Sequence, residues 1–224
     1  MQRVFGKGDE FQSAIVATIV ARTRALGSAK LTPERAREIM GANCFGVEEA
    51  IRHFGVTPQR HEIAALSEIP WSEATLERAK ETHVLVACFP LSILEIRNKA
   101  KLFYGQSWYN KESFAKDRGE AEWKLVKKTP VANSTSKTWP EQQALLGQNE
   151  ETPTARVMIY TTIGHFLSTS ERLFEKVYVR CSDVGSSGGR VSVGGFGSDG
   201  LGVCDGWDDG RGGSVGVSAA RKSE

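Results

Sequence analysis

"TPTARVMIYTTIGHFLSTSERLFEKVYVRCSD" (residues 152–183) is the stretch that most strongly indicates how this chain folds. Its first part places apolar side chains at the spacing of a mostly buried helix, at positions 157, 159, 163, 166 and 167. Its last part alternates Val177 and Val179 with Tyr178 and Arg180, which predicts a strand with two different faces. A buried helix followed by a strand predicts an α+β domain.

The segments just before this stretch predict further strands and one more helix. "HVLVACFPLSILEI" (83–96) is rich in Val, Leu and Ile, and it is expected to be a buried strand interrupted by Pro90. The aromatic segments 102–115 and 121–131 are expected to form edge strands and turns. "TSKTWPEQQALLG" (135–147) predicts a short helix that Thr138 caps and Gly147 ends.

The first part of the chain is expected to be helical, because it is divided by helix-starting and helix-ending residues. "EFQSAIVATIVARTRALGS" (10–28) has apolar residues at helical spacing and a glycine at its end. Thr32 followed by Pro33 predicts the start of a second helix, which Gly41 ends. A third helix is expected within "FGVEEAIRHFG" (45–55). Further helices are expected to begin at the Thr57-Pro58 pair and at Ser72.

Length and composition suggest one medium domain with a helical extension: 224 residues, of which 40% are hydrophobic. We therefore expect a helical N-terminal section over 1–82 and an α+β domain over 83–224. The formal net charge is +2 with the two signs interspersed, so a nucleic-acid partner is not expected. The four cysteines form no CxxC pair, which argues against a zinc site or a dense disulfide scaffold; a single disulfide stays open.

No targeting or membrane segment is expected. The apolar run Ala14–Ala21 is short, and Asp9 and Glu10 precede it where a signal peptide would carry basic residues. No stretch approaches the length of a membrane span. The default expectation is a soluble, cytoplasmic protein.

The last forty residues are unusually rich in glycine, with thirteen of the chain's 23 glycines within 185–224. Such a density is typical of a disordered tail. However, valines recur in alternating pairs at 191 and 193 and at 215 and 217, as in short strands. Exposure of the Trp207 side chain to water in a solvated linker would also be energetically unfavourable. We therefore expect loops held on a sheet, with a disordered tail as the alternative.

Two features of this region suggest calcium. "GGFGSDGLG" (194–202) matches the nonapeptide of calcium-binding β-rolls, which need several successive turns, whereas only one copy is present. Asp205, Asp208 and Asp209 could form a carboxylate cluster, but nothing in the pattern fixes its geometry. Solvated surface acids are the preferred interpretation, and no metal ligand is predicted.

No motif for catalysis or cofactor binding is found. The chain shows no Ser-His-Asp or Cys-His spacing, no phosphate loop and no metal-binding histidine pair. His165 lies within an apolar segment and is interpreted as a core histidine; His53 and His61 are interpreted as surface or packing residues. Cys88, within an apolar strand, is expected to be an inert buried thiol. We predict no catalytic residue, no cofactor and no enzymatic activity.

"FGSDGLGVCDGWDDGRGGSVGVSAARKS" (196–223) resembles the variable proteins of diversity-generating retroelements. This resemblance implies a C-type lectin-like domain of mixed, mostly antiparallel strands with two helices. It also implies a C-terminal variable region, here about 194–218, that binds a changing and so far unknown ligand, expected to be a protein. Three residues would be scaffold anchors: Trp207 through burial, Arg211 through hydrogen bonds to backbone carbonyls, and Arg221.

The resemblance also implies which positions are rewritten. In such proteins, Asn codons in a template are copied with errors at adenines. Codons for Gly, Ser, Asp and Cys can all arise from an Asn codon by such changes. The implied variable surface consists of Gly197, Ser198, Gly202, Cys204, Asp205, Gly206, Asp208, Asp209, Gly210, Gly212, Gly213 and Ser214.

An enzyme of the formylglycine-generating type is an alternative on the same kind of fold. Its chemistry needs two reactive cysteines close together, and Cys181 and Cys204 are the candidate pair. Copper binding at these residues would favour this alternative.

Overall fold

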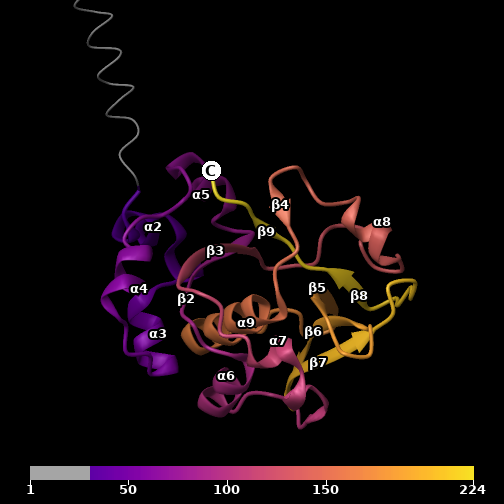
Figure 1. The fold of residues 1–224 in the computed structure, drawn as a ribbon. Coiled ribbons are helices and arrows are strands. Elements are labelled where there is room, and N and C mark those ends of the chain that lie inside the picture. Colours follow the sequence, from indigo (N-terminus) through magenta and orange to yellow (C-terminus); the bar gives the residue numbers. More distant parts are fainter. Residues whose placement is uncertain (1–30) are drawn as a thin grey trace, which may run out of the picture.

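The computed structural model describes residues 31–224, and helix α9 (Ala155–Thr169) runs between its two sheets (Figure 1). The helix contacts strands of both sheets, so residues 155–165 are all buried and apolar side chains occupy every side of the helix. The predicted buried helix is thus confirmed. It begins at a capping residue, because the Thr154 hydroxyl accepts a hydrogen bond from the Val157 amide at 3.3 Å. The helix predicted over 10–28 and the run Ala14–Ala21 lie outside the described residues.

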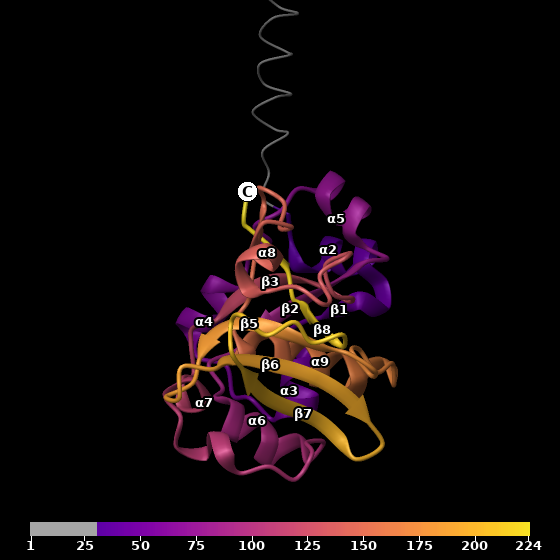
Figure 2. The same cartoon turned by 90° about the vertical axis from the view of Figure 1, so that its right-hand side faces the viewer.

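Two mostly antiparallel sheets flank this helix (Figures 1 and 2), which confirms the α+β prediction. The first has the order β1-β2-β3-β9-β4, and only its β1–β2 pair is parallel. The second has the order β7-β6-β5-β8, and only its β5–β8 pair is parallel. The strands of the first sheet are β1 (Cys44–Phe45), β2 (His83–Cys88), β3 (Glu122–Lys127), β4 (Glu150–Glu151) and β9 (Ala220–Arg221). Those of the second are β5 (Tyr178–Val184), β6 (Arg190–Gly197), β7 (Gly200–Gly206) and β8 (Val215–Val217).

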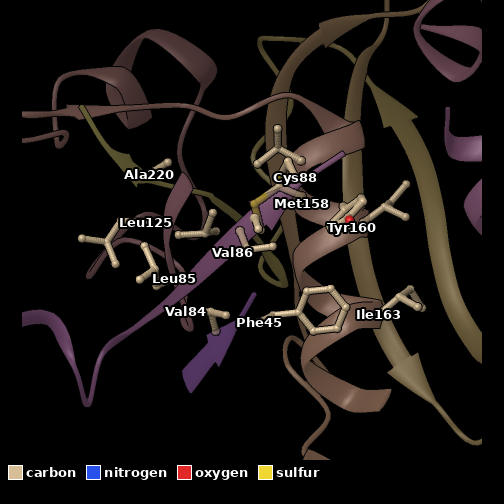
Figure 3. Packing of buried hydrophobic residues seen from close by; sticks show 14 of the residues in the cluster. Phe45, Val84, Leu85, Val86, Cys88, Leu125, Met158, Tyr160, Ile163 and Ala220 are labelled. Atoms are coloured by element: carbon tan, nitrogen blue, oxygen red, sulfur yellow. The ribbon is translucent and has the colours of Figure 1, made fainter. Parts of the chain in front are cut away.

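The core lies where β2 packs against α9. Figure 3 shows Val86 and Cys88 of β2 close to Met158 of α9, and all three side chains are buried. Burial raises the pKa of the Cys88 thiol to about 12, so the predicted inert buried thiol is confirmed. Gly164 lets α9 approach β1 closely, because a Cβ at this position would lie 3.0 Å from the Phe45 ring.

The N-terminal helices belong to this same core. Thr32 caps the first of them through the Arg35 amide at 3.3 Å, and Gly41 ends it, as predicted. Their apolar side chains join the buried cluster of residues 83–220, and β1 extends the sheet of β2, so one core spans the boundary expected at residue 82. These elements are α2 (Pro33–Met40), η1 (Gly41–Asn43), α3 (Val47–Phe54), α4 (Arg60–Ala65) and α5 (Glu73–Ala79).

The predicted start of α4 at Thr57-Pro58 is wrong. The helix begins at Arg60, where the Glu62 carboxylate accepts a hydrogen bond from the Gln59 amide at 2.7 Å. A glutamate at the third helical position stabilises the first turn in this way and sets the start.

Several predictions over 83–131 are also corrected. The strand expected over 83–96 ends at Cys88, because Ser92 and Glu95 form a reciprocal cap that begins α6 (Ile93–Ala100). Segment 102–115 forms no edge strand, but the short helices η2 (Trp108–Lys111) and α7 (Ser113–Lys116). β3 is a central strand, because the distant strand β9 pairs with its free side.

The helix expected over 135–147 is present as α8 (Trp139–Gln143), and Glu141 accepts hydrogen bonds from the amide and hydroxyl of its cap, Thr138. The predicted end at Gly147 is wrong, because the helix already ends at Gln143. Within residues 31–224, none of the helices has the length and apolar character needed to cross a membrane.

Candidate binding surface

The glycine-rich segment forms a β-hairpin that packs one face against α9 (Figure 2). Val191 and Val193 on β6 and Leu201 and Val203 on β7 are all fully buried in the core. The alternating valines therefore mark strands, as predicted, and the alternative of a disordered tail is not supported for these residues. Because side chains alternate along a strand, the residues between these apolar ones face away from α9.

On this outer face, the ring of Tyr178 lies against glycines of the neighbouring strands. A Cβ at Gly195 would lie 2.6 Å from the Tyr178 hydroxyl oxygen, and a Cβ at Gly202 would lie 2.5 Å from it. Gly202 is itself buried. The expectation that Gly202 is an exchangeable surface position is therefore wrong, because any side chain there would displace the ring.

Arg180, also on the outer face of β5, holds the loop that follows β7. Its side chain is 4% exposed, and its Nη2 donates to the carbonyls of Trp207 at 3.0 Å and Gly210 at 2.8 Å. Its Nη1 donates to the Lys137 carbonyl at 3.2 Å and to the Gln142 side chain at 3.1 Å. One buried guanidinium thus joins the loop to the segment around α8.

The role expected of Arg211 is performed by Arg180. Arg211 is exposed and forms an ion pair with Glu141 at 2.9 Å, and within residues 31–224 it donates no hydrogen bond to a backbone carbonyl. The position of Arg211 within the loop suggested an anchor, whereas the actual anchor approaches from a strand about 30 residues earlier in the chain. The third expected anchor, Arg221, is half-buried on β9, in the other sheet.

The expectation that Trp207 is buried is also wrong. This side chain is 65% exposed, and part of its ring lies over Gly188, where a Cβ would come 3.3 Å from Cζ3. Val184, at the end of β5, is 46% exposed. The loop therefore presents a large aromatic ring to solvent among small polar residues.

Asp208 is a structural residue of the loop. Arg190 binds it through two bonds, from Nε at 2.8 Å and from Nη2 at 3.0 Å, which lower the pKa of the Asp208 carboxyl. The Arg190 guanidinium also stacks 3.9 Å over the ring of Trp139. Trp139 in turn donates its backbone amide to the Asp208 carbonyl at 2.7 Å.

The structure separates the implied variable positions into two groups. Gly197 and Ser198 lie at the β6–β7 turn, and the others lie along β7 and in the loop beyond it. Seven strand residues separate the turn from the loop, a distance of roughly 20 Å. The exposed positions are Ser198, Asp205, Gly206, Asp209, Gly212, Gly213 and Ser214, and the half-buried ones are Gly197, Cys204, Asp208 and Gly210.

The hairpin differs from a calcium-binding β-roll and separates the two candidate cysteines. Residues 194–202 lie in an antiparallel hairpin, which differs from the parallel coils of a β-roll. Asp205 accepts a hydrogen bond from Ser187 at 3.0 Å, and within 31–224 no three His, Cys, Asp or Glu side chains are grouped as metal ligands would be. Cys181 is fully buried, whereas Cys204 aligns across β6 with Arg180 on the outer face, so the two thiols lie on opposite faces of the sheet.

Three histidines lie on helices: His165 on α9, His53 on α3 and His61 on α4. His165 is 1% exposed and bonds Glu171 at 2.7 Å, so it is a satisfied core histidine as predicted. Burial lowers the pKa of its ring, which is therefore neutral at pH 7. His53 is half-buried and His61 is exposed.

The sequence did not reveal the roles of Arg180 and Tyr178, nor that residues 102–108 cover the edge of β7. The Val203 amide of β7 donates to the side-chain oxygen of Gln106 at 3.0 Å, and Nε1 of Trp108 donates to the Val203 carbonyl at 2.9 Å. The one available signal for Arg180 was its alternation with Val179, which placed it on the outer face without identifying its partners.

Comparison of the chain with models of known families, with curated proteins and with solved structures gives no match.

Proposed function

We propose that this chain is a non-enzymatic binding protein that presents exchangeable side chains to a protein ligand from residues 204–214, the end of β7 together with the loop beyond it, called loop 204–214 below. The observation that carries the proposal is the way in which Arg180 holds the loop. It bonds the carbonyls of Trp207 and Gly210, and the side chains of the exposed positions take no part in these bonds. Substitution costs little stability at exposed positions with free space around them, such as Gly206, where a Cβ would meet nothing within 4 Å; Gly212 is an exception, because a Cβ there would lie 2.9 Å from Val215 Cγ2.

The composition of the surface supports a protein ligand. Trp207 is the kind of large, exposed aromatic residue that contributes strongly to protein interfaces, and small residues around it leave room for a partner to approach. Asp205 and Asp209 add polar groups at its rim.

We further propose that a retroelement rewrites this surface and that residues 83–224 have a C-type lectin-like fold, whose core the N-terminal helices extend. The chain order from β3 onward supports the fold assignment, because β3 is followed by α8 and α9, with only the two-residue strand β4 between them, and then by short strands and loops. The last strand, β9, returns to pair with β3. The adjacent DNA tests the diversification: we expect a reverse transcriptase gene beside a near-copy of the codons for 194–218 that differs at adenines.

A library experiment tests the binding function. Gly206, Asp209 and Gly213 would be randomised together with Asp205 and Ser214, and the library would be selected against a panel of unrelated proteins. The control library randomises five exposed positions within residues 31–82: Glu34, Glu38, Arg52, Glu68 and Glu77. We expect binders from the loop library alone. Failure of the loop library on every target, or equal success of both libraries, would contradict the proposal.

A further inference from the structure

A shallow pocket, largely open to solvent, lies at the C-terminal end of α6, apart from loop 204–214. It is a cavity of about 460 Å³, lined among others by Arg97, Lys101, Phe103 and Tyr104. This volume falls within the range of small-ligand sites. Figure 2 shows α6 beneath the sheet on the side of β7.

The cavity is positively charged. In the part of the chain that the structure describes, the lining contains no Asp or Glu, and neither Arg97 nor Lys101 forms an ion pair. Arg97 is held in place, because its Nη1 donates to the Gln106 carbonyl at 3.1 Å and its guanidinium lies 5.1 Å from the centre of the Tyr109 ring. Two neighbouring cations without acidic partners are suited to a dianionic group.

The cavity also offers aromatic surface on a fixed backbone. The Tyr104 ring is 51% exposed, and the side chain of Phe103 is half-buried beside it. Gly105 adds no bulk beside them, and a Cβ at this position would meet no atom within 4 Å. The backbone is anchored to β7, because the Tyr104 amide donates to the Leu201 carbonyl at 3.0 Å and the Leu201 amide donates to the Leu102 carbonyl at 2.8 Å.

We propose that this cavity binds a small aromatic phosphate ester. The phosphate would contact Arg97 and Lys101, and the flat ring would pack against Tyr104. The preformed backbone reduces the conformational entropy that binding must overcome. This site shares no residue with the proposed binding loop, so either proposal can fail without the other.

The test uses the full chain and three probes: phenyl phosphate, inorganic phosphate and benzyl alcohol. Titration calorimetry gives the affinities, and ¹⁵N NMR follows the amides of Gly105, Gln106 and Ser107. We expect phenyl phosphate to bind with one site and to shift these amides. Inorganic phosphate should bind more weakly, and benzyl alcohol should not bind. Absence of amide shifts with phenyl phosphate at millimolar concentration would overturn the proposal.

Two lysine variants separate local from general charge effects. Lys101 has φ +53°, which asparagine tolerates, so Lys101→Asn removes the charge with little backbone strain. It should weaken phenyl phosphate binding about fivefold, as expected for one exposed ion pair. Lys99→Gln, which removes a charge of the same helix outside the cavity lining, is the control and should leave the affinity unchanged. Equal weakening by both variants would overturn the assignment.

A third variant tests the ring contact. Tyr104→Ala should reduce the affinity for phenyl phosphate to that for inorganic phosphate, and thermal unfolding of each variant confirms that the fold persists. An unchanged preference for phenyl phosphate in this variant would show that the ring binds elsewhere and would refute the proposed contact.

Discussion

Nη2 of Arg180 lies 2.8 Å from the carbonyl oxygen of Gly210, and this hydrogen bond joins the outer face of β5 to a loop 30 positions later in the chain. The same nitrogen donates to the Trp207 carbonyl at 3.0 Å. A buried arginine bonded to carbonyls fixes a backbone without constraining which side chains that backbone carries. The conformation of the loop should therefore depend on Arg180 and be insensitive to its own exposed residues.

Replacing Arg180 tests this dependence. Arg180→Met removes a guanidinium that is 4% exposed and leaves the carbonyls of Lys137, Trp207 and Gly210 without this donor. We expect the free energy of unfolding to fall by about 3 kcal/mol, measured by urea denaturation. The control is Arg211→Met, which breaks only an exposed ion pair with Glu141 and should cost below about 1 kcal/mol. Similar costs for both variants would contradict the assignment of Arg180 as the anchor.

The glycines of the variable region should differ sharply in their tolerance of a side chain. A Cβ at Gly202 would lie 2.5 Å from the Tyr178 hydroxyl and 3.1 Å from the Gly194 carbonyl, whereas a Cβ at Gly206 would meet nothing within 4 Å. Gly202→Ser should therefore lower the free energy of unfolding by about 1–3 kcal/mol. Gly206→Ser should change it by less than about 0.5 kcal/mol. If thermal unfolding shows the two variants to be equally stable, Tyr178 does not occupy this space.

Stability should decrease in mild acid because of His83. Burial, and then the charge of Lys127, lowers the pKa of its ring from 6.5 to about 4. The unfolded chain therefore binds a proton at a pH where the folded protein does not, so stability is full above pH 6.5 and falls as the pH drops towards 4. His165, whose pKa is also lowered by burial, contributes in the same direction.

The variant His83→Asn isolates this contribution. We expect its melting temperature to decline less than that of the parent protein between pH 6.5 and pH 4.5. The exposed residue His61 provides a control, since His61→Asn should leave the decline unchanged. Identical pH profiles for His83→Asn and the parent would show that His83 titrates normally in the folded protein.

Local signals in the sequence predicted much of the fold correctly. The buried helix α9, the strand β5 and the capping roles of Thr32 and Thr138 all depend on residues a few positions apart, and the structure confirms them. Spacing and capping express the geometry of single elements, so one sequence suffices to recognise them.

Contacts between distant residues could not be predicted in the same way. β3 is a central strand only because β9 pairs with it, and Glu224 accepts hydrogen bonds from the amide of Ser72 and the hydroxyl of Thr75 at the start of α5. The sequence likewise contains nothing that distinguishes Arg180, which is buried against carbonyls, from Arg211, which is exposed. Such roles depend on which segments meet in space.

The exposed ring of Trp207 should contribute to binding and little to stability. It is 65% exposed, so Trp207→Ala should change the free energy of unfolding by about 0.5 kcal/mol or less. Trp139→Ala is the matched control. Trp139 is half-buried and stacked under Arg190, so its removal should cost more stability.

In binders selected from the loop library, Trp207→Ala should weaken binding by at least about tenfold, as expected for an interface hot spot. The affinities would be measured by surface plasmon resonance. Full affinity without Trp207 would show that the binding site does not include this ring, because a ligand bound to the loop would lose its contact with the ring in this variant.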